Sequence, residues 1–425
     1  MIYAALAVNT YYSQETPVSG GTITEGIVGT PRFVNPALAQ TRADQDVVAL
    51  VYSGLLKIDT DGNLVPDIAE SITAAEDGLS YNIKLKRDIA FHDGTPVTAR
   101  DVAYTIQLIQ DPDLKSPLRG NWVDVSIEEV SEYELNIFLE EAYAPFVENF
   151  TLGIIPAHIW STLPTEQIPF SQLNTEPVGS GPFRVIDSKR DASGIINRYT
   201  LSAFRANDSQ PKVDSLELTF YQNEDDLLTA LSDGEIDATA YVSNERISSF
   251  TDNGYELFSK PLPRTFGIFF NQNRSSALRD AAAREALTAA IDRRRLIDEV
   301  LYGYGVPITG PTTFASFELE STDDTNTASS ITPKEQAVTI LKDGGWELTE
   351  NGLWGKDIGG NAVELSLTLR TSNTPLFDDL VAFVTEQWKE MGIEVVVEQY
   401  EQTGLVQSVI RTRDFQALLF GLDMI

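Results

Sequence analysis

The sequence predicts a mixed α/β fold (α+β) that is divided into several domains. Segments with the two-residue period of strands alternate along the chain with segments of helical period, which is typical of this fold class. The 425 residues correspond to about three domains of roughly 150 residues each. Hydrophobic residues make up 42% of the chain and charged residues 22%, a composition that supports a large buried core.

The charge and the cysteine count exclude whole classes of function. Acidic residues number 63 and basic residues 31, so the net charge is −32, which disfavours a nucleic-acid partner and adhesion to an anionic membrane. The chain has no cysteine, which excludes disulfides, thiolate nucleophiles and cysteine-ligated metals. His92 and His158 are the only histidines, too few for a multi-histidine metal site. We therefore expect no cofactor and no metal.

The first residues contain an apolar stretch, from Ile2 to Val8, that is far shorter than a membrane span of roughly 20 residues. Two interpretations stay open for it: the remnant of a signal peptide or membrane anchor, or a frayed terminus. Residues 1–21 as a whole are predicted to be a linker or anchor remnant, because the stretch before Gly21 is polar and rich in glycine and proline. Membrane contact is expected only through such an anchor.

The first expected element is a strand that begins at Thr22 and leads into an irregular loop, residues 30–36, with two prolines. A helix is expected from Asp44 to Leu56, because its apolar residues share one face. Residues 59–63 (DTDGN) resemble the start of a calcium loop, but Leu64 stands where that loop requires glycine. A hairpin turn is therefore the better interpretation.

The next segment combines a strand, a turn and a helix. Residues 81–87 alternate between apolar and polar side chains, and residues 91–96 (FHDGTP) form a turn. Thr98 and Asp101 have the spacing of a capping box, and the helix that follows carries an apolar stripe. Another strand is expected over residues 133–139.

The second half continues the alternation, and its elements are expected in the following order. The chain turns into a strand at Val178–Val185, and then come a strand at 216–220, a helix at 224–231, a strand at 265–271, a helix at 280–291 and a helix from Asp292 to near Leu301. A polar surface loop at 321–330 precedes a helix from Thr332 to Gly344, a strand at 363–369, a helix at 376–391, a strand at 393–397 and a strand at 415–423.

No motif of an enzyme stands out. The chain lacks the G-x-S-x-G elbow of serine hydrolases and the P-loop of ATPases. His92 and His158 lie in turn-rich segments, where a structural hydrogen bond is the favoured role. Carboxylate pairs are inevitable among 63 acidic residues, so a hydrolase with two acids stays an alternative, but no pair is singled out. We predict that the protein is not an enzyme.

Several blocks together resemble one family. Residues 77–87 (DGLSYNIKLKR) followed by 91–102 (FHDGTPVTARDV) are similar to the signature of the family 5 extracellular solute-binding proteins of ABC importers, the oligopeptide- and dipeptide-binding class. Further similar blocks occur in family order at 64–70, 178–185, 231–237, 270–293, 337–346 and 388–397. The resemblance covers roughly residues 22 to 423.

The resemblance implies a two-lobed periplasmic-binding-protein-like architecture with an extra subdomain. Residues 22–46 and 178–262 are expected to form domain I, residues 47–177 domain II, and residues 263–425 domain III. Members of the family continue past the point where this sequence stops, so domain III is expected to be incomplete, without its final return segment. An unpaired sheet edge and marginal solubility, or a completing partner chain, are expected from that.

The implied function is a receptor outside the cytoplasm, periplasmic or on the cell surface, that closes two lobes on a peptide and delivers it to a membrane permease with its ATPase. The same resemblance suggests the ligand-binding residues: Arg32, Phe33, Val34 and Asn35 in the first loop, Arg264, Phe266 and Asn271 at the start of domain III, and Asp423 for the peptide's amino terminus. A receptor for another solute, such as an oligosaccharide or a metal chelate, and a surface sensor or scaffold that does not transport stay open as alternatives.

Overall fold

The computed structural model describes residues 19–207, 211–260, 264–308, 331–401 and 404–423. The predicted apolar stretch near the amino terminus and the predicted polar loop at 321–330 lie outside these ranges. The chain divides into two compact units, Met1–Val242 and Ser243–Ile425, and each is described by itself. This boundary lies about twenty residues before the predicted start of domain III, and the division of unit 1 into domains I and II stays a prediction.

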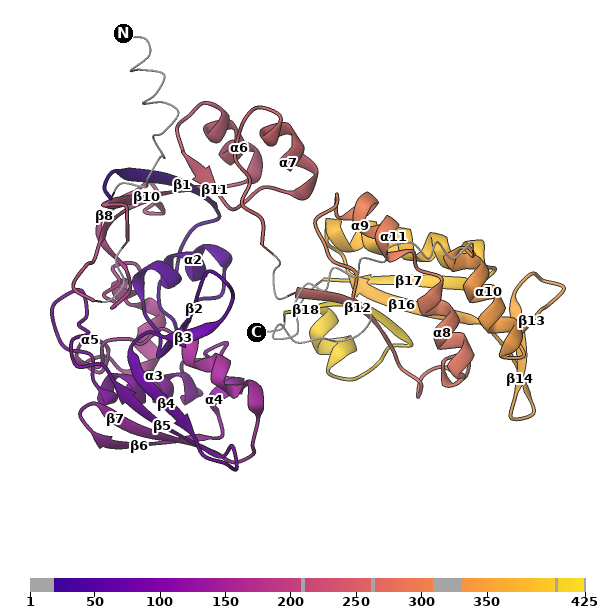
Figure 1. Ribbon diagram of the computed structural model, residues 1–425, viewed down its shortest axis with the longest axis horizontal. Coiled ribbons are helices and arrows are strands. Elements are labelled where there is room, and N and C mark those ends of the chain that lie inside the picture. The colour runs from indigo at the N-terminus through magenta and orange to yellow at the C-terminus, as the bar shows by residue number, and fades with distance from the viewer. Residues whose placement is uncertain (1–18, 208–210, 261–263, 309–330, 402–403, 424–425) are drawn as a thin grey trace, which may run out of the picture. The chain divides into compact units, whose positions relative to one another are not determined.

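Unit 1 contains a five-stranded sheet with the order β11-β1-β10-β9-β8 (Figure 1). Its first strand, β1 (Thr22–Val28), pairs in parallel with β10 (Ser215–Tyr221) and β11 (Ala238–Thr239). The strands β8 (Phe183–Arg190) and β9 (Ile196–Ala203) complete the sheet with antiparallel pairing. The predicted strands at the start of the chain, after Val178 and at 216–220 are confirmed.

A second sheet of unit 1 has the order β4-β5-β7-β6 and is antiparallel throughout. Its strands are β4 (Ala69–Ala74), β5 (Ser80–Leu85), β6 (Val125–Ser131) and β7 (Glu134–Leu139). Both the strand and the capped helix predicted around residues 81–110 are confirmed: Tyr81, Ile83 and Leu85 are buried, and α3 (Ala99–Gln110) begins with the Thr98–Asp101 capping box.

The helix predicted from Asp44 to Leu56 is shorter than expected. α2 (Arg42–Val51) ends where the Val51 carbonyl accepts a hydrogen bond from the Gly181 N–H, at 2.8 Å. Gly179 passes so close that a β-carbon there would lie 2.0 Å from the same carbonyl oxygen. Because the glycine-rich block occupies the space beyond Val51, the chain leaves the helix and continues as a predicted hairpin, β2 (Leu56–Ile58) and β3 (Leu64–Pro66).

The remaining elements of unit 1 are short. They are α4 (Arg119–Trp122), α5 (Ala157–Trp160), α6 (Glu224–Ser232) and three 3-10 helices at Ala144–Thr151, Thr165–Phe170 and Gln172–Asn174. One continuous core joins both sheets to α2 and α3, with Trp122, Trp160 and Tyr199 among its buried side chains.

Unit 2 is built on a four-stranded sheet with the order β12-β18-β16-β17. α11 (Pro375–Glu390) is the crossover between the parallel strands β16 (Ser366–Ser372) and β17 (Glu394–Tyr400), and it packs on both. β18 (Ala417–Asp423) runs antiparallel to β12 (Arg264–Phe270). In Figure 1 the helices α8 (Ala281–Ala289), α9 (Arg293–Val300) and α10 (Pro333–Asp343) lie with α11 beside this sheet.

The strand predicted over residues 363–369 is two strands. β15 (Asn361–Glu364) belongs to a small sheet with β13 (Glu347–Leu348) and β14 (Trp354–Ile358), and β16 belongs to the main sheet. Between them, Leu365 is buried and donates its N–H to the Trp354 carbonyl at 2.7 Å. Strand alternation continues through Leu365, so the pattern alone does not reveal the change of sheet.

Three buried tryptophans hold the core of unit 2 together. The indole N–H groups of Trp346, Trp354 and Trp388 donate to Asp280, to the Met391 carbonyl and to the Leu287 carbonyl. Other elements of the unit are α7 (Asn244–Thr251), a 3-10 turn at Ala277–Arg279 and a π-helical turn at Leu405–Ile410. Every helix in the described ranges of both units is too short or too polar to cross a membrane.

The predicted structural role of His92 is confirmed. Its ring is buried, Nδ1 accepts the Gly179 N–H at 3.3 Å, and Nε2 faces the Gly181 carbonyl at 3.1 Å. The ring therefore ties the turn at 91–96 to the glycine-rich block. Burial lowers the pKa of His92 from its usual 6.5 to about 4, since a charged imidazole is costly in this place.

We expect this histidine to make the protein less stable as the pH falls. Between pH 6.5 and pH 4 the unfolded chain binds a proton at His92 that the folded chain does not, so this group removes up to about 3 kcal/mol of folding free energy over that window. Urea unfolding at pH 7 and at pH 4 should show the loss in the natural protein. Between these two pH values the His92→Gln variant should lose less folding free energy than the natural protein does, by about this amount. An equal loss of folding free energy in both proteins would contradict the prediction.

Candidate functional site

The first candidate segment is the loop that follows β1. Its backbone is held by Asp44, which lies in the first turn of α2 and is fully buried. One carboxylate oxygen accepts the N–H groups of Arg32 and Phe33, at 2.7 and 2.8 Å. The other accepts the N–H and the hydroxyl of Thr41, at 3.2 and 2.8 Å. A single carboxylate therefore fixes the helix start and the loop at once.

The four predicted loop residues divide into two pairs. Arg32 is exposed with its guanidinium 5.9 Å from the ring centre of the half-buried Phe33. Val34 and Asn35 have no exposed surface. The Val34 N–H donates to the Asn174 carbonyl at 2.8 Å, and the Asn35 side chain accepts from the Ala37 N–H at 2.9 Å. The structure places these two side chains in the core, where they support the loop, and leaves Arg32 and Phe33 accessible.

Sequence reasoning missed the role of Asp44 in this loop. The signal was present, because Thr41 and Asp44 have the same T-x-x-D spacing as the capping box at Thr98 and Asp101. A capping box predicts only the helix start. The two additional hydrogen bonds to Arg32 and Phe33 join residues eleven and twelve positions apart and depend on the path of the loop.

α2 also anchors the last residues of unit 1. The Tyr241 hydroxyl donates to the Asp46 carboxylate at 2.6 Å, and the Arg42 guanidinium lies 4.6 Å above the Tyr241 ring. Burial, together with the nearby Asp46 charge, raises the pKa of Glu25 on the adjacent strand. Side chains of α2 thus contact both the candidate loop and the segment that leads out of the unit.

In unit 2, the predicted residues lie at two opposite ends of one pair of strands. Arg264 and Asp423 are register partners at one end of β12 and β18. Phe266 faces Gly421 two positions along and packs edge-on against Phe377, with ring centres 5.9 Å apart. Asn271 follows the other end of β12, seven residues from Arg264, a distance of roughly 23 Å along an extended strand. Among the predicted residues of unit 2, Arg264, Phe266 and Asp423 thus lie on the strands near one end of the pair, and Asn271 lies at the other end.

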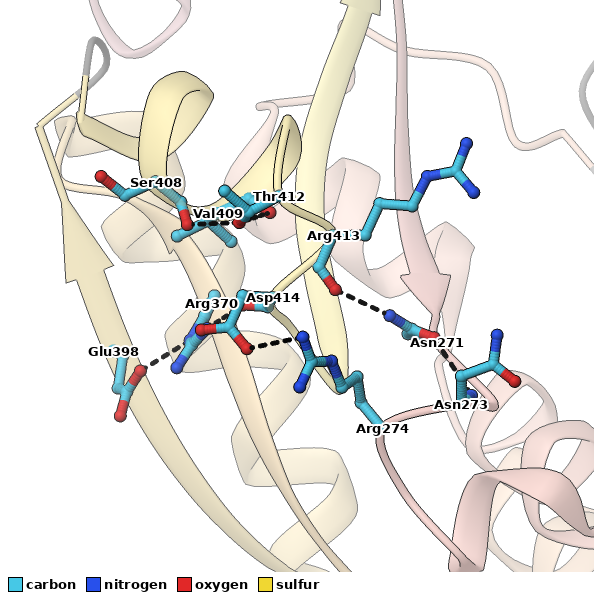
Figure 2. Close-up of polar contacts among 10 residues, drawn as sticks. All are labelled: Asn271, Asn273, Arg274, Arg370, Glu398, Ser408, Val409, Thr412, Arg413 and Asp414. Carbon is cyan, nitrogen blue, oxygen red and sulfur yellow. Dashed lines mark hydrogen bonds and ion pairs between the residues drawn. The ribbon is translucent and has the colours of Figure 1, made fainter.

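Asn271 instead lines an open surface hollow of about 610 Å³. The side-chain amide of Asn271 donates to the Arg413 carbonyl at 3.0 Å (Figure 2). The backbone N–H of Asn271 donates to the Gln416 carbonyl at 2.8 Å. Both bonds hold the turn that precedes β18 against the end of β12. The hollow is lined by Phe269, Phe270, Asn271, Gln272, Asn273, Arg274, Thr412, Arg413 and Phe415.

A chain of ion pairs runs beside the hollow, as Figure 2 shows. Arg370 contacts Glu398 at 2.7 Å and Asp414 at 3.1 Å, and Asp414 contacts Arg274 at 3.5 Å. The hydrogen bond from Arg370 holds the pKa of Glu398 below its usual value. Among the described residues, no group of three or more histidine and acidic side chains is placed to hold a metal ion. The polar and aromatic groups that line the hollow are arginines, side-chain amides, a threonine and phenylalanine rings.

Comparisons with known proteins agree on one family. The model described as "Bacterial extracellular solute-binding proteins, family 5 Middle" matches residues 63–424. The oligopeptide-binding protein AppA of Bacillus subtilis is 28% identical, over 96% of this chain and 74% of AppA. The nickel-binding periplasmic protein of Escherichia coli is 24% identical, over 84% of this chain and 67% of that protein.

Solved structures give the same result. AppA of Bacillus subtilis in complex with a nonapeptide matches with a TM-score of 0.65 and 26% identity, over 96% of this chain and 80% of that structure. The substrate-binding protein CtaP of Listeria monocytogenes matches with a TM-score of 0.74 and 26% identity, over 96% of this chain and 79% of that structure. The predicted mixed α/β, two-lobed fold class is confirmed by these neighbours.

Proposed function

Because this chain belongs to family 5 of the bacterial extracellular solute-binding proteins, we propose that it is the substrate-binding component of an ABC-type importer and that it captures peptides. Proteins of this family bind substrates for ABC transporters outside the cytoplasm and are not enzymes. AppA, which is named for oligopeptide binding, is similar over nearly the whole chain.

One feature of unit 2 carries the preference for a peptide. β18 pairs with β12 over its whole length, but with β16 only at Ala417 and Leu418. Beyond Leu418, the Leu419 carbonyl accepts the hydroxyl of Thr371 on β16 at 3.0 Å, and the main-chain groups of β18 from Phe420 onward lie on a flank that no strand of the described residues pairs with in a ladder. An extended peptide binds through such main-chain groups, whereas a compact metal chelate does not use them.

The separation of the candidate residues supports the same ligand. Arg264 and Asp423 lie at one end of the strand pair and Asn271 at the other, roughly 23 Å away, which equals the length of about seven extended residues. In this proposal Asp423 receives the peptide's amino terminus, Arg264 and Phe266 lie beside it, and Asn271 lies toward the carboxyl end. Arg32 and Phe33 contact the ligand from the first loop, supported by Val34 and Asn35.

Capture requires that binding stabilise one arrangement of the two units over another. We propose that the units close on the peptide by a hinge motion, and that the closed form is recognised by a membrane permease with its ATPase. The protein would act outside the cytoplasm, in a periplasm or at a cell surface. Small-angle scattering with and without peptide tests the closure, and an unchanged radius of gyration at saturation would contradict it.

A metal chelate is the second candidate, because the nickel-binding periplasmic protein of Escherichia coli is 24% identical. Two experiments distinguish a peptide receptor from a metal-chelate receptor. The first is mass spectrometry of ligands carried through native purification, and the second is calorimetric titration with hexapeptides, nickel–histidine and an oligosaccharide. We expect peptides in the first experiment and heat only from hexapeptides in the second. Binding of nickel–histidine or sugar without any peptide binding would overturn the proposal.

A further inference from the structure

The hollow at the end of β12 differs in charge from the rest of the protein. Acidic residues outnumber basic ones by 63 to 31 in the whole chain, yet the described lining of the hollow has no carboxylate. Two arginines, Arg274 and Arg413, lie among three side-chain amides and three phenylalanines. A chain of net charge −32 repels an acidic ligand over most of its surface, so a local cationic site is what such a ligand needs.

Two acidic side chains beside the hollow, Asp414 and Glu398, are already paired. Asp414 lies between Arg370 and Arg274, and Glu398 is held by Arg370. Two guanidinium groups, those of Arg370 and Arg274, thus face two carboxylates and balance their charge. Within the described residues no hydrogen bond or ion pair engages the Arg413 guanidinium, and Figure 2 shows it extending away from this chain of ion pairs.

The backbone at Arg413 is held in an unusual conformation. Its φ angle is +53°, in the left-handed region that glycine and asparagine adopt more easily than arginine. The turn is fixed by the Asn271 amide on the Arg413 carbonyl and by the Arg413 N–H on the Ile410 carbonyl, at 3.0 and 3.1 Å. This turn holds Arg413 beside the hollow, with its guanidinium unpaired among the described residues.

We propose that this hollow selects peptides with an acidic side chain, which the Arg413 guanidinium binds through its forked N–H donors. The three phenylalanines of the lining contact the methylene groups of the ligand. The inference rests on the proposed function and deepens it, because it assigns a substrate class to a site that is otherwise without one.

The full chain is first freed of any bound ligand by partial unfolding and is then refolded. The test is calorimetric titration of this protein with two pools of hexapeptides. One pool carries a single glutamate at any position, and the other carries glutamine instead. We expect the natural protein to bind the glutamate pool at least tenfold more tightly. Arg413→Gln should reduce this preference to twofold or less, and Arg413→Asn, which suits the left-handed backbone, should do the same with an unchanged melting temperature.

Arg411→Gln is the matched control, since it removes the same charge two residues away and outside the hollow. It should keep the tenfold preference. Equal affinity of the natural protein for both pools would overturn the inference while the proposed function stands, and so would an equal loss of preference in the Arg411 and Arg413 variants. The preference for the glutamate pool should persist when the peptides are amidated at the carboxyl terminus. If amidation removes it, the assignment of the Arg413 site to an acidic side chain is overturned. Failure to bind either pool would instead overturn the proposed function.

Discussion

Replacing Asp44 with alanine is expected to lower the free energy of unfolding by about 4 kcal/mol. The carboxylate is fully buried and accepts hydrogen bonds from the backbone N–H groups of Arg32, Phe33 and Thr41. Without it, three partly buried N–H groups lose their acceptor at once, and each unpaired group costs at most about 1–3 kcal/mol, although such losses are not fully additive. Urea unfolding monitored by far-UV circular dichroism measures the effect.

The same substitution should weaken peptide binding more than tenfold even where the variant is folded, because Arg32 and Phe33 would no longer be held in one position. Gln45→Ala is the matched control, since Gln45 is the next residue on α2 and is exposed. It should change the free energy of unfolding by less than about 0.5 kcal/mol and leave peptide affinity unchanged. An Asp44→Ala variant with the stability and affinity of the natural protein would show that the carboxylate does not organise this loop.

Asp101→Ala is expected to have a comparable effect, a loss of about 4 kcal/mol. One oxygen of this buried carboxylate accepts the N–H and the hydroxyl of Thr98, at 2.9 and 2.8 Å. The other accepts the N–H of Ala157 at 2.9 Å, a residue 56 positions away. The substitution therefore removes the start of α3 and its attachment to α5 together.

The control for Asp101 is Arg100→Ala, which alters an exposed residue in the same turn of the helix. Because the hydrogen bonds of the Asp101 carboxylate among the described residues of unit 1 go to Thr98 and Ala157, away from the candidate loop, peptide affinity should stay within twofold wherever the variant is folded. This contrast separates the two aspartates: Asp101 is expected to support the fold alone, and Asp44 is expected to support both the fold and the candidate loop. A loss of affinity in folded Asp101→Ala equal to that of Asp44→Ala would contradict the separation.

The sequence by itself determined much of the local structure. Strand alternation predicted β5, β7 and β10, and the T-x-x-D spacing predicted the start of α3, because side-chain direction and helix capping depend on residues only a few positions apart. The family was also within reach of the sequence, since the blocks at 77–87 and 91–102 are contiguous and specific.

Contacts between distant segments were decided only by the tertiary structure. α2 stops at Val51 because Gly181, 130 residues later, caps its last carbonyl, and Leu365 separates two strands that the pattern joins. Asn271 follows the last residue of β12, and Asp423 is the last residue of β18. Because the two strands run antiparallel, these two residues lie at opposite ends of the strand pair, and Asn271 contacts the turn before β18. Local sequence patterns specify which face of an element is buried, but the partner that covers this face depends on where the rest of the chain returns.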